Sequence, residues 1–433
     1  MSIPLDRLYH YIDNVAKEIN NNNIVIYRFY PHGSKKLSDL GELYRYPWEE
    51  KFEHGPLICY DQEPLDYEYY QSLPESTQTT DLIDRLNISR NNLKKVVNNL
   101  SRYYMLLHSE QRSINLEKYC NDQFIPIYYW SHALISLDWF RYAHHIQQKK
   151  TVTKKFLIYN RAWSNTREYR LKFIELLIKL GLENHCQTSV NPVEPELGIH
   201  YNAHQFKNPA WRPNIPLENY FPLNTAQSHY SADFNIEDYE ATDIEVVLET
   251  LFDDGRLQLT EKSLRPIACG QPFILAGTHG SLEYLRSYGF KTFGDMWDES
   301  YDLIEDPKER LIRIAELMKQ ILNWNSDEYA NQMTRARAVA DYNKKHFFSK
   351  EFINQVVTEL KNNLQSAISK HNKIDIADNV CEFIKKWKEW LLNEEMQSYL
   401  ENNSKENYLV PTIARVENFL IKLQHQYINK DTL

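Results

Sequence analysis

Residues 259 to 275, LTEKSLRPIACGQPFIL, are the stretch that most narrows what this chain can fold into. A polar segment ends at Thr260, an amphipathic helix follows it, and Gly270 ends that helix before the apolar strand 273–275. The Thr260 hydroxyl suits an N-cap because it can accept a hydrogen bond from a free backbone N–H of the first turn. The stretch therefore predicts a helix that leads directly into a strand of an α/β fold.

Glu261 and Lys262 fall in the first turn of this predicted helix, where free backbone donors and the positive end of the dipole favour an anion. The Glu261 carboxylate can bind a ribose diol, and the Lys262 ammonium can bind a phosphate. These two groups are what a site for a nucleoside diphosphate needs. A capped surface helix with an incidental Glu-Lys pair explains the same residues equally well.

The bulk composition sets limits on the class of protein. A chain of 433 residues is too long for one ordinary core, so we expect two or three domains. The formal charge of −9 gives no overall basic surface for nucleic acid, although it leaves room for a local basic groove. The five cysteines are scattered and form no CxxC pair, which favours a reducing compartment over disulfides or a zinc site.

The order of apolar and polar segments predicts strands that alternate with helices. Neither a signal-peptide core at the N-terminus nor an apolar run of about 20 residues is present, so we expect a soluble, cytoplasmic protein. The expected strands and helices indicate α/β layers with parallel sheets. Strands are expected at 24–30, 57–60, 103–109, 125–130, 244–252, 273–275 and 291–293, and helices at 81–100, 283–290, 309–324 and 349–370. Residues 156–173 are expected to form a strand, a polar loop and a helix in that order. A Lys-rich linker is expected at 147–155, and a small helical appendage at 371–433.

Two polar clusters follow expected strands, and ligands of open α/β sheets bind where strands end. Asp61 and Glu63 stand at a turn fixed by Pro64, and either carboxylate could act as a general base toward an acceptor hydroxyl. A solvated turn is the simpler interpretation of these two residues. Asn160 and Arg161 open the second cluster.

Two further arginines, Arg167 and Arg170, are three residues apart and are expected on one helix face, where guanidinium groups suit phosphates. A charged helix face accounts for that spacing as well. Glu249 and Thr250 form a third cluster, at the end of an apolar strand. The acidic residues that follow it are too sparse for a calcium loop, and no metal is predicted. GxSxG, P-loop, GxGxxG and HExxH motifs are absent from the sequence, which removes support for hydrolase, P-loop and dehydrogenase functions.

The order of these clusters resembles a known family. A Glu-Pro turn, an Asn/Arg loop, a Glu strand end and a Thr-Glu-Lys helix are similar to the inverting α-1,3-fucosyltransferases and to the fucosyltransferase-like glycosyltransferases of bacteriophages. The similarity is strongest over 244–302 and weaker over 156–170 and 56–70, and it does not extend beyond about residue 370. It implies a GT-B architecture with two Rossmann-like domains, at 1–150 and 151–345, and a crossover helix with a helical appendage at 346–433.

The resemblance also implies roles for individual residues. Glu261 would bind the nucleotide ribose and Lys262 a diphosphate oxygen, while Arg161 or Arg167 would neutralise the leaving group. Thr260 and Glu249 complete the implied donor site, and Glu63, with Asp61 as the alternative, would be the general base. The donor would be a nucleoside-diphosphate sugar, and no metal or other cofactor would be required.

The chain departs from the family at one position that concerns the donor, and the resemblance does not decide the chemical class of the acceptor. The family has a tyrosine two places before the Thr-Glu-Lys, where this chain has Gln258, so a guanine base and a fucosyl group are not implied. The bacteriophage relatives imply either a hydroxymethylated or hydroxylated pyrimidine in phage DNA, in the host cytoplasm, or a glycan or protein. A DNA acceptor would need a basic groove, and the lysines at 149–155 and 385–388 could form one. An ordinary solvated face explains the same lysines. A non-catalytic scaffold that kept the fold, with Trp387 and Trp390 docking a partner, is the alternative of another class.

Overall fold

The computed structural model describes residues 25–28, 35–36, 57–61, 65–66, 104–109, 111, 127–195, 197–222, 233–253, 255–371 and 385. The chain divides into two compact units, and each is built from separate segments of the sequence. Unit 1 comprises Met1–Ile12, Ser109–Ile114 and Tyr129–Lys361, and unit 2 comprises Asp13–His108, Asn115–Tyr128 and Asn362–Leu433. The domain boundaries that the resemblance implies at residues 150 and 345 remain predictions.

Unit 1 contains a parallel sheet of four strands in the order β10-β9-β7-β8. The strands are β7 (Lys154–Ile158), β8 (Cys186–Thr188), β9 (Thr242–Leu248) and β10 (Phe273–Ala276). All seven residues of β9 are buried, as a strand inside a parallel sheet requires when helices cover both faces. The α/β prediction is confirmed for this unit.

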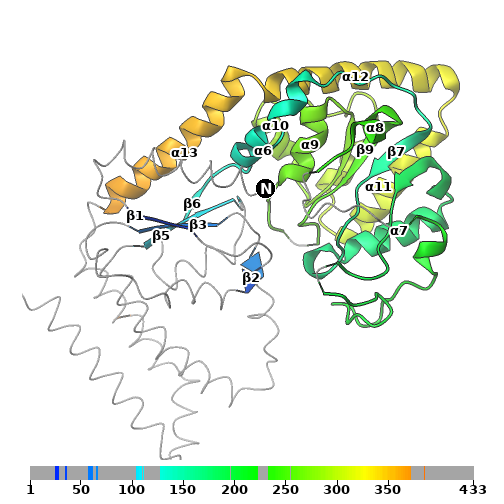
Figure 1. The fold of residues 1–433 in the computed structure, drawn as a ribbon, viewed down its shortest axis with the longest axis horizontal. Coiled ribbons are helices and arrows are strands. Elements are labelled where there is room, and N and C mark those ends of the chain that lie inside the picture. Colours follow the sequence, from blue (N-terminus) through cyan, green and yellow to red (C-terminus); the bar gives the residue numbers. More distant parts are fainter. Residues whose placement is uncertain are drawn as a thin grey trace, which may run out of the picture. The chain divides into compact units, whose positions relative to one another are not determined.

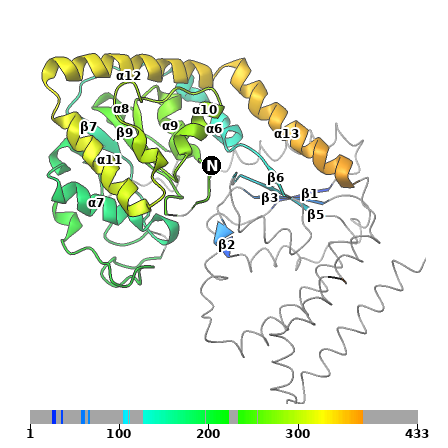
Figure 2. The ribbon, with the colours of Figure 1, turned by 180° about the vertical axis from the view of Figure 1, so that it is seen from behind.

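Eight α-helices lie within the described chain. They are α6 (Ala133–Trp139), α7 (Tyr169–Lys179), α8 (Ile236–Glu240), α9 (Glu261–Cys269), α10 (Ser281–Ser287), α11 (Pro307–Leu322), α12 (Ser326–Phe347) and α13 (Lys350–His371). Short 3₁₀ turns are η3 (Arg141–His145), η4 (Asn165–Arg167), η5 (Glu183–His185), η6 (Leu217–Asn219) and η7 (Ser300–Leu303). Figures 1 and 2 show α9 on one face of the unit 1 sheet, packed against α6 and α12, and α7 with α11 on the other face.

Helix α9 begins and ends where its sequence predicts. The Thr260 hydroxyl accepts a hydrogen bond from the Lys262 N–H, and Gly270 takes the left-handed conformation (φ 73°) that a residue with a side chain rarely adopts. Its inner face is held by a buried ion pair between Arg265 and Glu245 on β9, with an Nη2–Oε1 distance of 2.5 Å. The middle of α9 is therefore fixed to the sheet through its buried face.

The Lys-rich segment is not a linker, because its lysines bind inside unit 1. Lys150 Nζ donates to the carbonyl oxygens of Tyr239 and Thr242, at 2.7 and 2.8 Å, and burial lowers its pKa to about 8. Lys155 Nζ lies 3.4 Å from the ring centre of Tyr329 and 4.0 Å from an Asp243 oxygen. The prediction of a linker is wrong here because β7 begins at Lys154 and uses this segment as its approach.

Two other expectations differ from the structure. Residues 291–293 do not form a strand, and α12, which the sequence analysis missed, packs against α9. Only five of the 22 residues of α12 are buried, so its sequence lacks the broad apolar stripe that marks a helix. Helices α11 and α13 agree with their predictions.

Unit 2 contains a second sheet of four strands, in the order β1-β3-β5-β6. Its strands are β1 (Val25–Arg28), β3 (Leu57–Asp61), β5 (Tyr104–His108) and β6 (Ile127–Tyr129). Strand β3 pairs in parallel with both β1 and β5, as expected, and Asp61 is its last residue. A short parallel pair joins β2 (Lys35–Lys36) to β4 (Leu65–Asp66). Glu63 and the tail at 372–433, apart from Lys385, lie outside the described residues.

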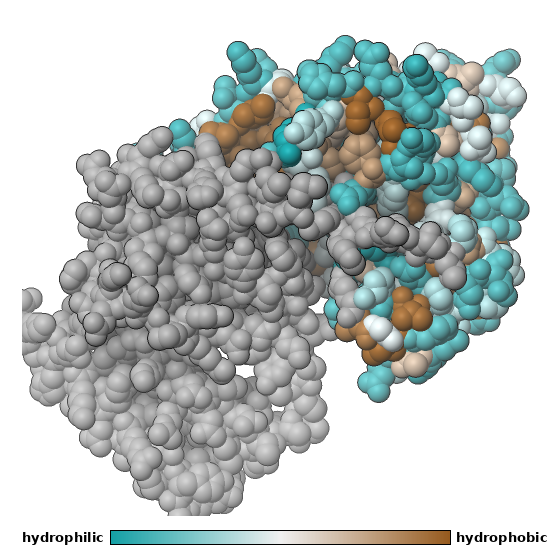
Figure 3. All heavy atoms as spheres, in the orientation of Figure 1, coloured by the Kyte–Doolittle hydropathy of each residue, from teal (hydrophilic) through white to brown (hydrophobic). Residues whose placement is uncertain are grey.

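One face of the described chain is shown in Figure 3. Figure 3 shows a mostly hydrophilic surface with small, separate apolar groups over the described residues on that side. In the described part, none of the helices has the length and apolarity that crossing a membrane requires. Two cysteines of unit 1, Cys186 and Cys269, are buried free thiols.

Candidate functional site

The strand order of unit 1 identifies one edge of the sheet as a place for a ligand. The order reverses between β7 and β9, since β8 lies on one side of this pair and β10 on the other. In open parallel sheets, ligands bind beyond the carboxyl ends of the strands at such a reversal. Asn160 and Arg161 follow the end of β7, and Glu249 directly follows the end of β9. The structure thus brings two of the predicted clusters to the same edge.

Glu249 fastens the start of α9 to this edge. Its Oε1 accepts hydrogen bonds from the N–H of Thr260 (2.9 Å) and from the N–H and hydroxyl of Ser263 (3.2 and 2.6 Å). Its Oε2 accepts from the N–H of Thr250 (2.9 Å) and from the Thr260 hydroxyl (2.8 Å). The carboxylate is fully buried and carries five donors.

This arrangement corrects one expectation about the helix start. Glu249 occupies the N–H groups of Thr260 and Ser263, which an incoming anion was expected to find free. An anion at this helix start is therefore left to charged side chains rather than to these backbone donors. Whether Glu249 itself contacts a ligand stays a prediction.

Glu261 and Lys262 project from the first turn as a close ion pair. Lys262 Nζ lies 2.7 Å from Glu261 Oε1 and also donates to the Thr260 hydroxyl at 3.3 Å. The two side chains are only 11% and 13% exposed, so solvent screens this ion pair weakly. The four-carbon stem of a lysine is flexible, so the Lys262 ammonium can also reach an anion placed beside the pair.

His132, which the sequence does not single out, lies beside this pair. It is the residue before α6, its Nε2 lies 3.8 Å from Glu261 Oε2, and its ring stacks on Trp130. Its side chain is 8% exposed, and its buried Nδ1 has no hydrogen-bond partner. No spacing in the sequence points to His132, because the packing of α6 against α9 brings it here.

Hydrogen bonds from neighbouring residues hold the backbone of the loop after β7, residues 160–167 (the β7 loop). Asn191 accepts at its carbonyl from the Trp163 indole (2.7 Å) and donates from its amide to the Arg161 carbonyl (3.1 Å). Arg170 donates to the Ala162 carbonyl and, across the sheet edge, to the Leu248 carbonyl, both at 2.7 Å. The loop is thus tied to the end of β9.

Several buried polar groups of the β7 loop are left without hydrogen bonds. In this loop, the two polar side-chain atoms of Asn160 are buried and have no hydrogen-bond partner, and the same is true of the hydroxyls of Ser164 and Thr166. The Thr188 hydroxyl, at the end of β8, is also buried without a partner. Asn165, in the middle of the loop, has φ 57°, the one positive φ outside glycine in the described chain. Orphaned polar groups and a strained backbone cost free energy, and both gather where a ligand can compensate for them.

The three arginines of this region have different environments. Arg161 and Arg167 are half-buried in the β7 loop, whereas Arg170 is buried on α7 and both of its terminal nitrogens donate to backbone carbonyls. The expectation that Arg167 and Arg170 share one helix face is wrong, since Arg167 ends η4 before α7 begins. Of the three, Arg161 and Arg167 are left as candidates for a phosphate.

Gln258, two residues before Thr260, is joined by a hydrogen bond to another segment of unit 1. Its amide donates to the Ser109 hydroxyl at 2.7 Å, and the side chain is buried. Asp61 closes β3 of unit 2, so its backbone lies at the carboxyl edge of the other sheet.

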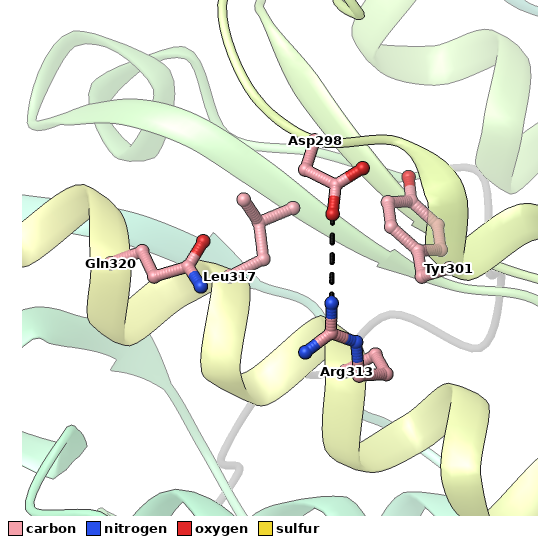
Figure 4. Close-up of a pocket in the computed structure, with 5 residues that line it drawn as sticks. All are labelled: Asp298, Tyr301, Arg313, Leu317 and Gln320. Atoms are coloured by element: carbon pink, nitrogen blue, oxygen red, sulfur yellow. Dashed lines mark ion pairs between the residues drawn. The ribbon is translucent and has the colours of Figure 1, made fainter.

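A small hollow elsewhere in unit 1 contains none of the predicted residues. Asp298, Tyr301, Arg313, Leu317 and Gln320 line it, and Figure 4 shows the ion pair between Asp298 and Arg313, at 3.6 Å. Both charged side chains are largely exposed, at 54% and 41%, which is ordinary for a surface ion pair. Among the described residues, no group of three or more His, Cys, Asp or Glu side chains could hold a metal ion.

Comparisons of the chain with models of known protein families, with curated proteins and with solved structures found no match. The chemistry of this edge of unit 1 therefore carries the functional argument.

Proposed function

We propose that the chain is a glycosyltransferase that transfers a sugar from a nucleoside-diphosphate sugar to a hydroxyl acceptor, with inversion. The observation that carries the proposal is the carboxyl edge of the unit 1 sheet. A carboxylate, an ammonium and a loop of unpartnered polar groups meet there, at the reversal of strand order. Glu261 would bind the ribose, Lys262 the diphosphate, and Arg161 or Arg167 the charge of the leaving group.

In the proposed mechanism, fixed positive charge stabilises the diphosphate as the bond to the sugar breaks. Lys262 and one arginine of the β7 loop would do this, because the negative charge grows on the leaving oxygen in the transition state. Glu63 would take the proton of the acceptor hydroxyl as its oxygen attacks the anomeric carbon from the opposite face. A GT-B arrangement of two Rossmann-like domains, closing around the donor, would exclude water.

The acceptor we propose first is the class that the resemblance gives first, a hydroxylated pyrimidine in DNA. The lysines at 149–155 do not favour a DNA acceptor, because the ammonium groups of Lys150 and Lys154 donate hydrogen bonds to carbonyl oxygens within unit 1. A glycan or protein acceptor is the alternative. Acceptor binding that weakens steeply as salt increases would indicate DNA, and binding that is insensitive to salt would indicate the alternative.

Lys262→Ala is expected to remove nucleotide binding without unfolding the protein. We would measure the melting temperature of the full chain with UDP, GDP, CMP, dTDP and their sugars, each with and without EDTA. One diphosphate should stabilise the wild type in the presence of EDTA and should not stabilise Lys262→Ala, because the ammonium no longer meets the phosphate. Lys308→Ala, on α11, is the matched control and should respond as the wild type does. If none of these nucleotides stabilises the wild type, the scaffold alternative replaces the enzyme.

Asn160→Leu is expected to move stability and binding in opposite directions. Leucine has nearly the same size and removes two buried atoms that lack partners, so the ligand-free protein should be more stable by about 1–3 kcal/mol. The same change should weaken nucleotide binding, since the amide is then no longer present for the ligand. Chemical denaturation and the thermal-shift panel measure the two effects. A loss of stability together with unchanged binding would show that Asn160 is a structural residue.

A further inference from the structure

We propose that the hydroxyls of Ser164, Thr166 and Thr188 bind the hydroxyl groups of the sugar that is transferred, once the tip of the β7 loop has opened. The inference rests on the proposed function, because it concerns the uncharged part of the same donor. Its basis is that these three residues are at most 9% exposed and that their hydroxyl oxygens have no hydrogen-bond partner. Buried polar groups of this kind are rare and gather where a ligand can satisfy them.

Two adjoining segments carry these hydroxyls. Strand β8 ends at Thr188, whose register partner on β7 is Ile158, so the end of β8 lies beside the residues that lead into the β7 loop. The side chain of Asn191, which follows shortly after Thr188, donates to the Arg161 carbonyl within that loop. The hydroxyls therefore belong to one part of the carboxyl edge of the sheet, where ligands of open parallel sheets bind.

The chemistry of these side chains fits a sugar better than a phosphate. A serine or threonine hydroxyl both donates and accepts a hydrogen bond, as sugar hydroxyls do, and it brings no positive charge to a phosphate. In the proposed function, Arg161 or Arg167 of the same loop holds the diphosphate. That diphosphate carries the ribose at one end, which we assign to Glu261, and the transferred sugar at the other. The uncharged hydroxyls beside the arginines thus match the transferred sugar.

The tip of the β7 loop has to open for this contact, because the three hydroxyl oxygens are covered in the structure. Asn165, which is exposed between Ser164 and Thr166, has a φ of 57°, a conformation that is costly for a residue with a side chain. Short-range bonds close this turn, from the Arg167 N–H to the Ser164 carbonyl (3.1 Å) and from the Glu168 N–H to the Asn165 carbonyl (3.4 Å). A change of Asn165 to a negative φ opens the turn and uncovers the hydroxyls.

The test is calorimetric titration of the full chain with UDP, GDP and dTDP, and with UDP-glucose, GDP-fucose and dTDP-glucose. Ser164→Ala and Thr188→Val each remove a hydroxyl that has no partner in the structure, so both variants should fold. Each should weaken binding of the nucleotide sugar by about three- to tenfold, as the loss of one neutral hydrogen bond does, and leave binding of the diphosphate unchanged. Thr334→Val, whose hydroxyl donates to the Ala330 carbonyl on α12, is the control and should bind as the wild type does.

Asn165 provides a second test, in which two variants act in opposite directions. Asn165→Gly removes the cost of the positive φ and stabilises the closed turn, so it should weaken binding of the nucleotide sugar by about two- to fivefold. Asn165→Ala makes the same φ more costly, because alanine tolerates it less well than asparagine, and should strengthen binding by about the same factor. Neither variant should change the affinity for the diphosphate alone.

The outcomes separate the two proposals. If Ser164→Ala and Thr188→Val bind the nucleotide sugar as tightly as the wild type does, the sugar contact is overturned and the donor site stands. If they weaken binding of the diphosphate as much as that of the nucleotide sugar, the assignment to the sugar is overturned as well. Shifts in the same direction for Asn165→Gly and Asn165→Ala, or no shift, would overturn the opening of the turn. If the wild type binds none of the six compounds, both proposals fail.

Discussion

Replacing Glu249 by alanine is expected to be among the most damaging single changes in unit 1. The change leaves three backbone N–H groups, those of Thr250, Thr260 and Ser263, without their acceptor. A buried donor that loses its partner costs roughly 1–3 kcal/mol, so a loss of several kcal/mol in the free energy of unfolding should result. Chemical denaturation of the full chain would measure it.

Glutamine at this position tests whether the charge or the shape of Glu249 matters. Each carboxylate oxygen accepts from at least one backbone N–H, so an amide NH₂ group meets another donor on whichever side it lies. Glu249→Gln should therefore also destabilise, by at least the cost of one unpaired donor. Glu237→Gln, at an exposed residue of α8, should stay within about 0.5 kcal/mol of the wild type. A Glu249→Gln variant as stable as that control would show that the five bonds contribute little.

The same residue shows how far the sequence predicts this site. Thr260, Gly270 and the strand that follows carry local signals, because a cap and a left-handed glycine depend on neighbours in the chain. Glu249 also stood out, as an acidic residue at the end of an apolar strand. The five groups that donate to Glu249 include the Ser263 hydroxyl, 14 residues further along the chain. They reach one carboxylate only because α9 packs against β9.

His132 and Asn160 illustrate the part that the sequence does not predict. A histidine before a short helix has no distinctive spacing, and it becomes part of the site because α6 packs against α9. Asn160 was visible as a polar residue after a strand, but its lack of hydrogen bonds depends on where Asn191 and Arg170 hold the loop. Long-range packing fixes both features, and periodicity carries no information about it.

The prediction of a linker at the lysines of 147–155 is wrong for the same reason, because it depends on long-range packing. A run of lysines is usually solvated, and composition alone favours that interpretation. Here three carbonyl oxygens and one amide oxygen accept from Lys150 and Lys154, so the ammonium groups satisfy acceptors of unit 1. The tertiary fold supplies these acceptors, and the sequence of the segment does not show them.

Glu63→Gln is expected to reduce sugar transfer by roughly 10²–10⁴-fold while donor binding stays unchanged, as loss of a general base does. The reason is that an amide cannot take the proton of the acceptor hydroxyl, although it has the same size as the carboxylate. In the sequence, Glu63 comes two residues after Asp61, the last residue of β3, and β3 of unit 2 runs parallel to both of its neighbours. Loops at the carboxyl ends of parallel strands carry the reacting groups in folds of this class.

The measurement pairs transfer kinetics with thermal shift by the same nucleotide sugar. Asp61→Asn is the matched variant, because it removes the other candidate carboxylate of the same turn. A large fall in kcat for Glu63→Gln with little change for Asp61→Asn assigns the base to Glu63, and the reverse result assigns it to Asp61. Near wild-type transfer by both variants would remove this turn from the chemistry, and the base would then have to come from another part of the chain or from the acceptor itself.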